Sequence, residues 1–296
     1  MEKICRIFSN KGNMERNRAE GWQHAKLSGH ENEVAVMHLF DDKAFCKQFA
    51  QRLGIADIVS ASVGGLNEED VDCVLGGKTK SKTDLVLTLC DGKSVNISIK
   101  KSLAGQVYLI SVDRFIEGYE KQYGVTISDD IKESLYLYFY GHKDVYNILN
   151  NANVTQGESA TLIQYQKDKG RLVWKSLKNY DSQKAERFKE WIRNNIVNII
   201  EFCFSRGLSK NKSDWADYVW YKNALGEHNS DYIYKIEDLK IAAQQNTEKV
   251  FESNRNGGST IRLPFGFVQW HQKQMQFHHN LLELQKLFKE TKDSEF

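Results

Sequence analysis

An aspartate and a lysine stand at the ends of two short apolar runs that a tight turn joins. Asp84 precedes the run 85–89, and Lys100 closes the tripeptide Ser98-Ile99-Lys100 at the end of the second run. Both runs alternate with a period of two, which is typical of strands that bury one face. A carboxylate and an ammonium group held side by side on a rigid sheet suit the metal-assisted hydrolysis of a phosphodiester.

The register of this hairpin decides which side chains meet. The Asp-Gly pair in the turn at 90–93 favours a two-residue loop, but that loop would set Asp84 opposite Ile99 and mix apolar with polar residues on each face. A slip of one residue turns every side chain over, so the hydrophobic pattern should override the turn preference. We therefore expect an odd loop of three or five residues, with Leu85 opposite Ile99 and Asp84 opposite Lys100.

Lysines crowd the same hairpin, although the formal net charge of the chain is only +2. A lysine-rich stretch is often just a solvated face. Beside an aspartate and a Gly-Gly turn, a surface that faces phosphate is the better interpretation. The lysines in question are Lys78, Lys80, Lys82, Lys93, Lys100 and Lys101.

Length and composition bound the class of protein. The 296 residues, 41% of them hydrophobic, can bury one large core or two modest ones. No apolar run approaches the ~18 residues of a membrane span, and the first residues lack the apolar core of a signal peptide. The five cysteines are odd in number, scattered and without a CxxC pair. We expect a cytoplasmic protein with reduced thiols.

Hydrophobic periodicity predicts helices and strands along the rest of the chain. We expect helices over 29–53, 107–124 and 182–206, the last ending at Gly207, and shorter helices over 215–225 and 236–250. The segment 55–78 indicates a loop with short strands, and 129–150 a helix or a strand around 135–140. Hairpins are predicted over 83–101, over 161–175 around Gly170, and as paired strands over 254–279.

The order of these motifs resembles a known enzyme family. Asp84, a strand, a turn and then Ser98-Ile99-Lys100 are similar to the core of PD-(D/E)XK nucleases. The stretch 76–84 (GGKTKSKTD) resembles the approach to the catalytic aspartate in MspI-like type II restriction endonucleases, and 96–102 (NISIKKS) resembles their lysine-bearing strand. The segment 273–277 (KQMQF) is similar to their closing, DNA-contacting strand, and Glu33 matches the glutamate of their N-terminal helix.

This resemblance implies an α/β fold: a restriction-endonuclease-like mixed central sheet flanked by helices. It implies one domain over 1–296, with a core at about 29–124 and 254–290 and a helical insertion at about 125–250. The family cleaves DNA with Mg²⁺, which Asp84 and the Ile99 carbonyl would hold. Asp84, Ser98, Lys100 and Glu33 would be the catalytic residues. Ser98 departs from the usual Asp or Glu, which puts a second metal in doubt.

The implied function is sequence-specific double-strand cleavage of DNA at a short palindromic site, by a monomer or homodimer. The implied functional partner is a cognate DNA methyltransferase, and no membrane is involved. Two alternatives stay open: a structure-specific repair or recombination nuclease, and a catalytically silent DNA-binding protein of the same fold. Residues expected to contact DNA, through phosphates or base edges, are Lys80, Lys82, Gln106, Tyr108, Ser111, Arg262, Gln269, Trp270, His271, Gln274, Gln276 and His278.

Overall fold

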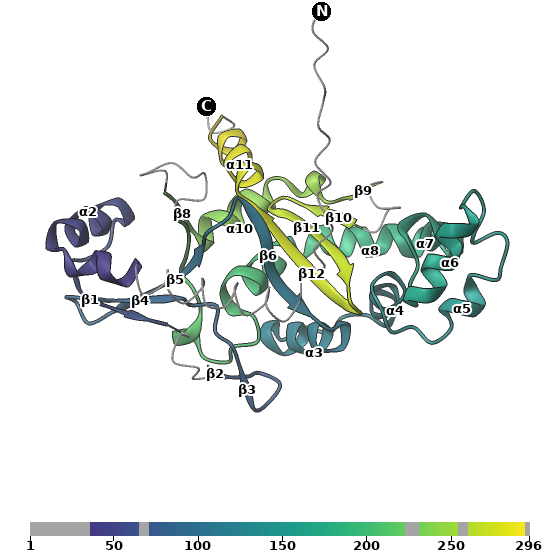
Figure 1. Cartoon of the computed structure of the whole chain (residues 1–296), viewed down its shortest axis with the longest axis horizontal. Coiled ribbons are helices and arrows are strands. Elements are labelled where there is room, and N and C mark those ends of the chain that lie inside the picture. Colours follow the sequence, from purple (N-terminus) through teal and green to yellow (C-terminus); the bar gives the residue numbers. More distant parts are fainter. Residues whose placement is uncertain (1–35, 65–70, 223–230, 254–259, 294–296) are drawn as a thin grey trace, which may run out of the picture.

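The chain folds around two sheets that meet near its middle. The structure is a computed structural model, and it describes residues 36–64, 71–222, 231–253 and 260–293. Within these residues the strands form two five-stranded sheets and a small two-stranded ribbon. In Figure 1 the first sheet lies on the left beneath α2, the second lies at the centre, and most helices lie to the right of and behind the second sheet.

The first sheet is mixed, with the strand order β1-β4-β5-β7-β8. Strand β5 pairs antiparallel with β4 but parallel with β7, and the other pairs are antiparallel. The predicted hairpin over 83–101 is thus confirmed as β4 and β5. The strands of this sheet are β1 (Ile58–Val63), β4 (Leu85–Leu89), β5 (Ser94–Lys100), β7 (Tyr218–Tyr221) and β8 (Tyr232–Lys235).

One face of this sheet packs against α2 (Lys43–Leu53), which follows a short 3-10 turn, η1 (His38–Asp41). Asp42 begins α2 by accepting a hydrogen bond from the Ala44 amide at 2.8 Å, and Gly54 ends it in the left-handed region. The alternate residues of β4 and β5 join Phe40 and Phe49 in this core. The alternation read from the sequence therefore identifies the buried face correctly.

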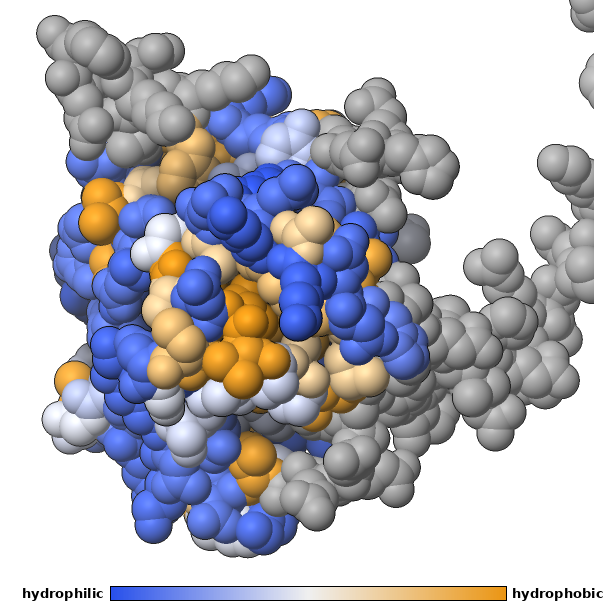
Figure 2. All heavy atoms as spheres, turned by 90° about the vertical axis from the view of Figure 1, so that its left-hand side faces the viewer, coloured by the Kyte–Doolittle hydropathy of each residue, from blue (hydrophilic) through white to orange (hydrophobic). Residues whose placement is uncertain are grey.

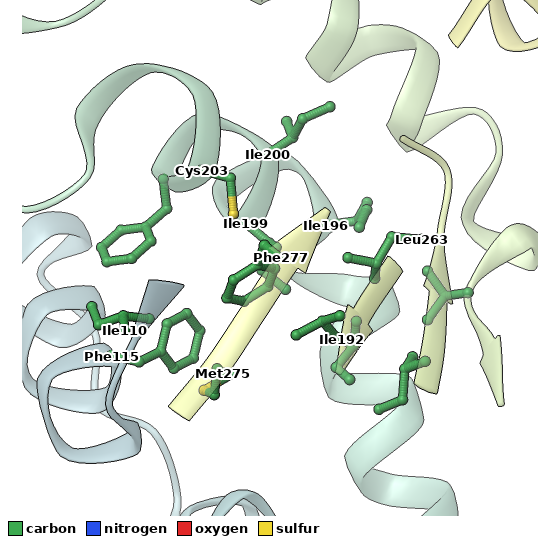
Figure 3. Packing of buried hydrophobic residues seen from close by; sticks show 14 of the residues in the cluster. Ile110, Phe115, Ile192, Ile196, Ile199, Ile200, Cys203, Leu263, Met275 and Phe277 are labelled. Atoms are coloured by element: carbon green, nitrogen blue, oxygen red, sulfur yellow. The ribbon is translucent and has the colours of Figure 1, made fainter. Parts of the chain in front are cut away.

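The second sheet is antiparallel, with the order β6-β12-β11-β10-β9. It covers the larger core with one face: Met275 and Phe277 of β12 are each only 2% exposed. Figure 3 shows these two side chains among Phe115 and the isoleucines of the neighbouring helices. The predicted paired strands of 254–279 are confirmed where described. The strands are β6 (Ala104–Ile110), β9 (Phe251–Ser253), β10 (Thr260–Leu263), β11 (Gly266–His271) and β12 (Gln274–Asn280).

Two predicted elements are wrong in type. The expected hairpin over 161–175 is helical, because Gly170 (φ +62°) ends α6 as a left-handed cap instead of forming a β-turn. The expected helix over 215–225 is strand β7, whose aromatic and β-branched residues suit a strand between two others. The helix expected over 107–124 begins only at Val112, since β6 runs to Ile110.

The long helix expected over 182–206 is confirmed in place but not continuous. It breaks at Asn195 and widens into a π-helical turn, η2 (Phe202–Arg206), before Gly207. Such turns are rare and occur often beside functional sites. The helices are α3 (Val112–Tyr123), α4 (Asp129–Tyr138), α5 (Val145–Ile148), α6 (Ala160–Lys169), α7 (Trp174–Tyr180), α8 (Ser182–Asn194), α9 (Ile196–Glu201), α10 (Ile236–Gln244) and α11 (Leu281–Asp293).

The architecture is a mixed α/β fold with a central mixed sheet flanked by helices, as the sequence predicts. The segment 125–250 is not helical throughout, however, because β7 and β8 lie in it and extend the first sheet. The helices in the described parts of the chain are all too short or too polar to span a lipid bilayer.

A groove of about 530 Å³ lies at the α2 end of the molecule, lined by residues such as Phe40, Asp57 and Val59. Figure 2 faces this end and shows an apolar area surrounded by hydrophilic residues. Ile58 pairs with Leu89, at the opposite end of β4 from Asp84. The groove is therefore separate from the cluster that contains Asp84.

Candidate active site

A series of hydrogen bonds joins three of the four predicted catalytic residues, at the start of β4 and the end of β5. The Ser98 hydroxyl donates to Asp84 Oδ2 at 3.1 Å, and Lys100 Nζ donates to the Ser98 oxygen at 2.7 Å. The backbone amide of Ile99 also donates to Asp84 Oδ2, at 2.6 Å. Ser98 is only 1% exposed, so the hydroxyl between the two charged groups is shielded from solvent.

The predicted register of the hairpin is wrong by two residues. Leu85 pairs with Ile97, not Ile99, and the turn is a three-residue loop in which the Leu89 amide donates to the Lys93 carbonyl. A shift of two keeps every side chain on its expected face. Its consequence is that Asp84 lies opposite Ser98 and reaches Lys100 through the hydroxyl instead of facing it directly.

The oxygen atoms around Asp84 suit a single Mg²⁺ ion that takes only some of its ligands from the protein. The hydrogen bonds from Ser98 and from the Ile99 amide both go to Oδ2, which leaves Oδ1 available within the described part of the chain. The Ile99 amide and carbonyl lie on the β4 side of β5, where the carbonyl receives a long 3.4 Å contact from Lys100. Mg²⁺ is often held by one or two carboxylates plus waters and substrate phosphate.

The described residues contain no group of three or more His, Cys, Asp and Glu side chains placed to hold a metal. Glu33, the fourth predicted catalytic residue, lies outside the described residues.

Lys80 and Lys82, which precede the hairpin and are expected to contact DNA, differ in position. Lys80 is exposed. Lys82 instead turns inward, with Nζ donating to the Val107 carbonyl at 3.0 Å and lying 3.5 Å from the centroid of the Tyr108 ring. Burial lowers the pKa of Lys82 to about 7, and the positive charge of Lys100 adds to this shift. Lys82 therefore differs from a surface lysine that neutralises phosphate.

Three predicted glutamines form an amide chain across the second sheet. Gln269 Nε2 donates to Gln276 Oε1 at 2.9 Å, and Gln276 Nε2 donates to Gln106 Oε1 at 2.8 Å. They come from β11, β12 and β6, three adjacent strands of the sheet. Gln276, in the middle, is only 9% exposed, so the outer glutamines present most of the accessible amide groups.

Other predicted DNA contacts share this polar face. Gln274 lies opposite His271, and the ring of His278 stacks on Phe267 with centroids 4.4 Å apart. Burial lowers the pKa of His278, which favours a neutral ring at physiological pH. Arg262, on β10 beside Phe267, is paired with Glu283.

Three predicted contacts lie elsewhere. Trp270 is on the opposite face, where it pairs with Met275 and packs against the core. Tyr108 also faces the core, in contact with Phe202, and burial raises the pKa of its hydroxyl. The Ser111 hydroxyl accepts from the Arg114 amide and begins α3.

A buried pair beside Lys100 escaped the sequence analysis. Tyr221 lies opposite Lys100 on the parallel strand β7, and its hydroxyl is 3.1 Å from Nδ1 of His279 on β12. Burial lowers the pKa of His279 to about 3, and the charge of Lys100 adds to the shift. The His278-His279 dipeptide is visible in the sequence, but nothing there tells which ring faces the core.

Comparisons with known proteins show a likeness to solved structures but not to sequence families. No protein-family model matches the sequence, and a search of curated proteins finds no match. Among solved structures, the crystal structure of the restriction endonuclease MspI in complex with its cognate DNA is similar, with a TM-score of 0.44 at 16% sequence identity. The match covers 80% of this chain and 77% of that chain.

Proposed function

We propose that this protein is a Mg²⁺-dependent endonuclease that hydrolyses phosphodiester bonds of double-stranded DNA at a short palindromic site, as type II restriction endonucleases do. The observation that carries the proposal is the hydrogen-bonded series Asp84–Ser98–Lys100 on two inner strands of the first sheet. It combines an oxygen ligand for a hard cation with an ammonium group that can meet developing negative charge.

Each residue of the chain has a distinct part in this chemistry. Asp84 Oδ1 and the Ile99 carbonyl would hold the ion, which when bound polarises the phosphodiester and lowers the pKa of nearby water. Lys100 orients or deprotonates the attacking water and stabilises charge on the phosphate oxygens. Ser98 fixes the direction of the Lys100 side chain through its 2.7 Å hydrogen bond.

Recognition of the DNA is assigned to the second sheet and to the hairpin approach. Amide groups hydrogen-bond to base edges in the major groove, whereas exposed lysines such as Lys80 neutralise phosphates. The outer glutamines, Gln106 and Gln269, are the base-reading candidates because the buried Gln276 uses its amide to hold them. We further propose a cognate DNA methyltransferase as the functional partner, since a nuclease of this class would otherwise cleave the DNA of its own cell.

Incubation of the purified protein with phage or plasmid DNA tests the proposal. With Mg²⁺ we expect a defined ladder of fragments whose sequenced ends share one motif, and with a chelator no cleavage. Fragments that begin at structural features such as branches would indicate a repair or recombination nuclease. Binding without any nicking at several Mg²⁺ concentrations would contradict nuclease activity and favour a silent DNA-binding protein.

A further inference from the structure

Lys82 connects the segment just before Asp84 with the second sheet. It precedes Asp84 by two residues, yet its ammonium group hydrogen-bonds to the Val107 carbonyl on β6 and lies over the ring of Tyr108 on the same strand. Strand β6 also carries Gln106, at one end of the amide chain. One side chain thus connects the approach to the catalytic aspartate with a strand of the proposed base-reading sheet.

The Lys82 side chain lies in a narrow space beside Gly207 and Tyr108. Gly207 ends the π-helical turn η2 with φ +52°, and a Cβ atom there would lie 3.1 Å from Lys82 Cε and 3.5 Å from the Tyr108 hydroxyl. The Tyr108 ring in turn packs on Phe202 of the same turn, with centroids 5.4 Å apart. A side chain at position 207 would crowd Lys82, so glycine at this position leaves room for the lysine.

The backbone on either side of Lys82 is also held. The hydroxyls of Ser81 and Thr83 both donate to the Asp214 carbonyl, at 2.8 and 3.1 Å. With its backbone fixed, Lys82 has a defined direction toward β6. Lys82 Nζ donates the hydrogen bond to the Val107 carbonyl. An apolar side chain of similar length cannot supply this donor.

We propose that Lys82 is a positioning residue that clamps β6 to the approach of Asp84, so that the two sheets keep one relative placement when DNA is bound. The expected effect on cleavage rests on the proposed function, whereas the clamp itself is a property of the free protein. Loss of the clamp should separate recognition from catalysis, because a small misplacement of the reacting groups costs rate far more than affinity.

Two measurements on Lys82→Met test the clamp, with Lys178→Met on the exposed face of α7 as the matched control. In the free protein, we expect amide hydrogen exchange in residues 104–110 to accelerate at least tenfold, with helix α8 unchanged. On the cleaved DNA sequence, we expect kcat to fall at least tenfold while the Kd for DNA stays within threefold. Lys82→Arg, which retains a donor, should recover part of both effects.

The outcomes separate the clamp from the function. Unchanged exchange in 104–110 overturns the inference, and so does faster exchange with a normal kcat. A purely structural role would lower the unfolding midpoint of Lys82→Met without changing kcat. If the wild-type protein cleaves no DNA, the proposed function fails, and the exchange measurement still decides whether the clamp exists. If Lys82→Met does not fold, Lys82→Gln replaces it in both measurements.

Discussion

Ser98 lies between Asp84 and Lys100, and its hydroxyl does what a second carboxylate could not. It donates to Asp84 and accepts from Lys100, so it joins the two charged groups without adding a charge. The Lys100 ammonium group is therefore aimed by a neutral partner and not neutralised by an adjacent anion. This arrangement leaves the full positive charge of Lys100 for a phosphate.

Replacement of Lys100 tests this directly. We expect Lys100→Ala to lose cleavage by about 100-fold or more, because a positioned charge-stabilising group is commonly worth about 3 kcal/mol in the transition state. DNA affinity should change only a few-fold. Lys178→Ala is the control, since Lys178 is exposed and α7 lies on the opposite side of the molecule from the hairpin (Figure 1). Near-normal cleavage by Lys100→Ala, in a single-turnover assay, would place the active site elsewhere.

Asp84 and Ser98 should differ in how much they contribute. Asp84→Asn keeps an acceptor for the Ile99 amide but removes the anionic ligand, so we expect it to abolish both cleavage and the response to Mg²⁺. Ser98→Ala removes one neutral hydrogen-bond partner of Lys100 and should slow cleavage about tenfold, from a loss of about 1 to 1.5 kcal/mol. Metal titrations of the cleavage rate compare the two, and equal, complete loss would contradict a single-metal site.

At the scale of elements, the hairpin shows what hydrophobic alternation can and cannot determine. Alternation identifies the face of each residue in β4 and β5, but a shift of two residues preserves it. The predicted partner of Asp84, Lys100, was therefore wrong, and Ser98 lies opposite instead. The residues of the turn indicate the correct register. Asp91 accepts from the Lys93 amide at 3.1 Å and Gly92 adopts φ +79°, which is typical of a three-residue loop closed by a left-handed glycine.

Strand β7 could not be predicted for a different reason. It is nearly buried on both faces because Val219 and Tyr221 pack in the larger core and Trp220 packs in the core beneath α2. It therefore lacks the alternation of a half-exposed strand. Its parallel partner lies more than a hundred residues earlier in the chain, and only tertiary contact reveals the pairing. The position of Tyr221 beside Lys100 was missed for this reason.

The amide chain of the second sheet predicts how specificity depends on its middle member. Gln276→Ala breaks both hydrogen bonds and frees Gln106 and Gln269, so we expect a loss of about 1–3 kcal/mol for the cleaved sequence and little for random DNA. Gln274→Ala, on the same face of β12 but outside the chain, is the control. Competition binding with specific and scrambled duplexes measures the ratio, and an unchanged ratio for Gln276→Ala would remove recognition from this chain.

At the scale of the whole molecule, the two sheets meet at side chains that must stay in fixed ionisation states. His279 of the second sheet is 2% exposed and faces Tyr221 and Lys100 of the first. A proton on its ring would place a second positive charge beside Lys100 in a site with little water. The junction between the sheets is therefore sensitive to acid.

The sign of that sensitivity follows from the pKa of His279, which is lowered from 6.5 to about 3 in the folded protein. Between pH 6.5 and about pH 3, His279 binds a proton in the unfolded chain but not in the folded protein. The free energy of unfolding therefore decreases as the pH falls below 6.5. At pH 5 this one group should cost about 2 kcal/mol. Denaturant unfolding at pH 7 and pH 5 should show the wild type losing about that much more stability than His279→Asn, which cannot titrate but can still hydrogen-bond to Tyr221. His38→Asn, at an exposed histidine, should behave as the wild type, and an equal acid loss in all three proteins would show that His279 is protonated in the folded state.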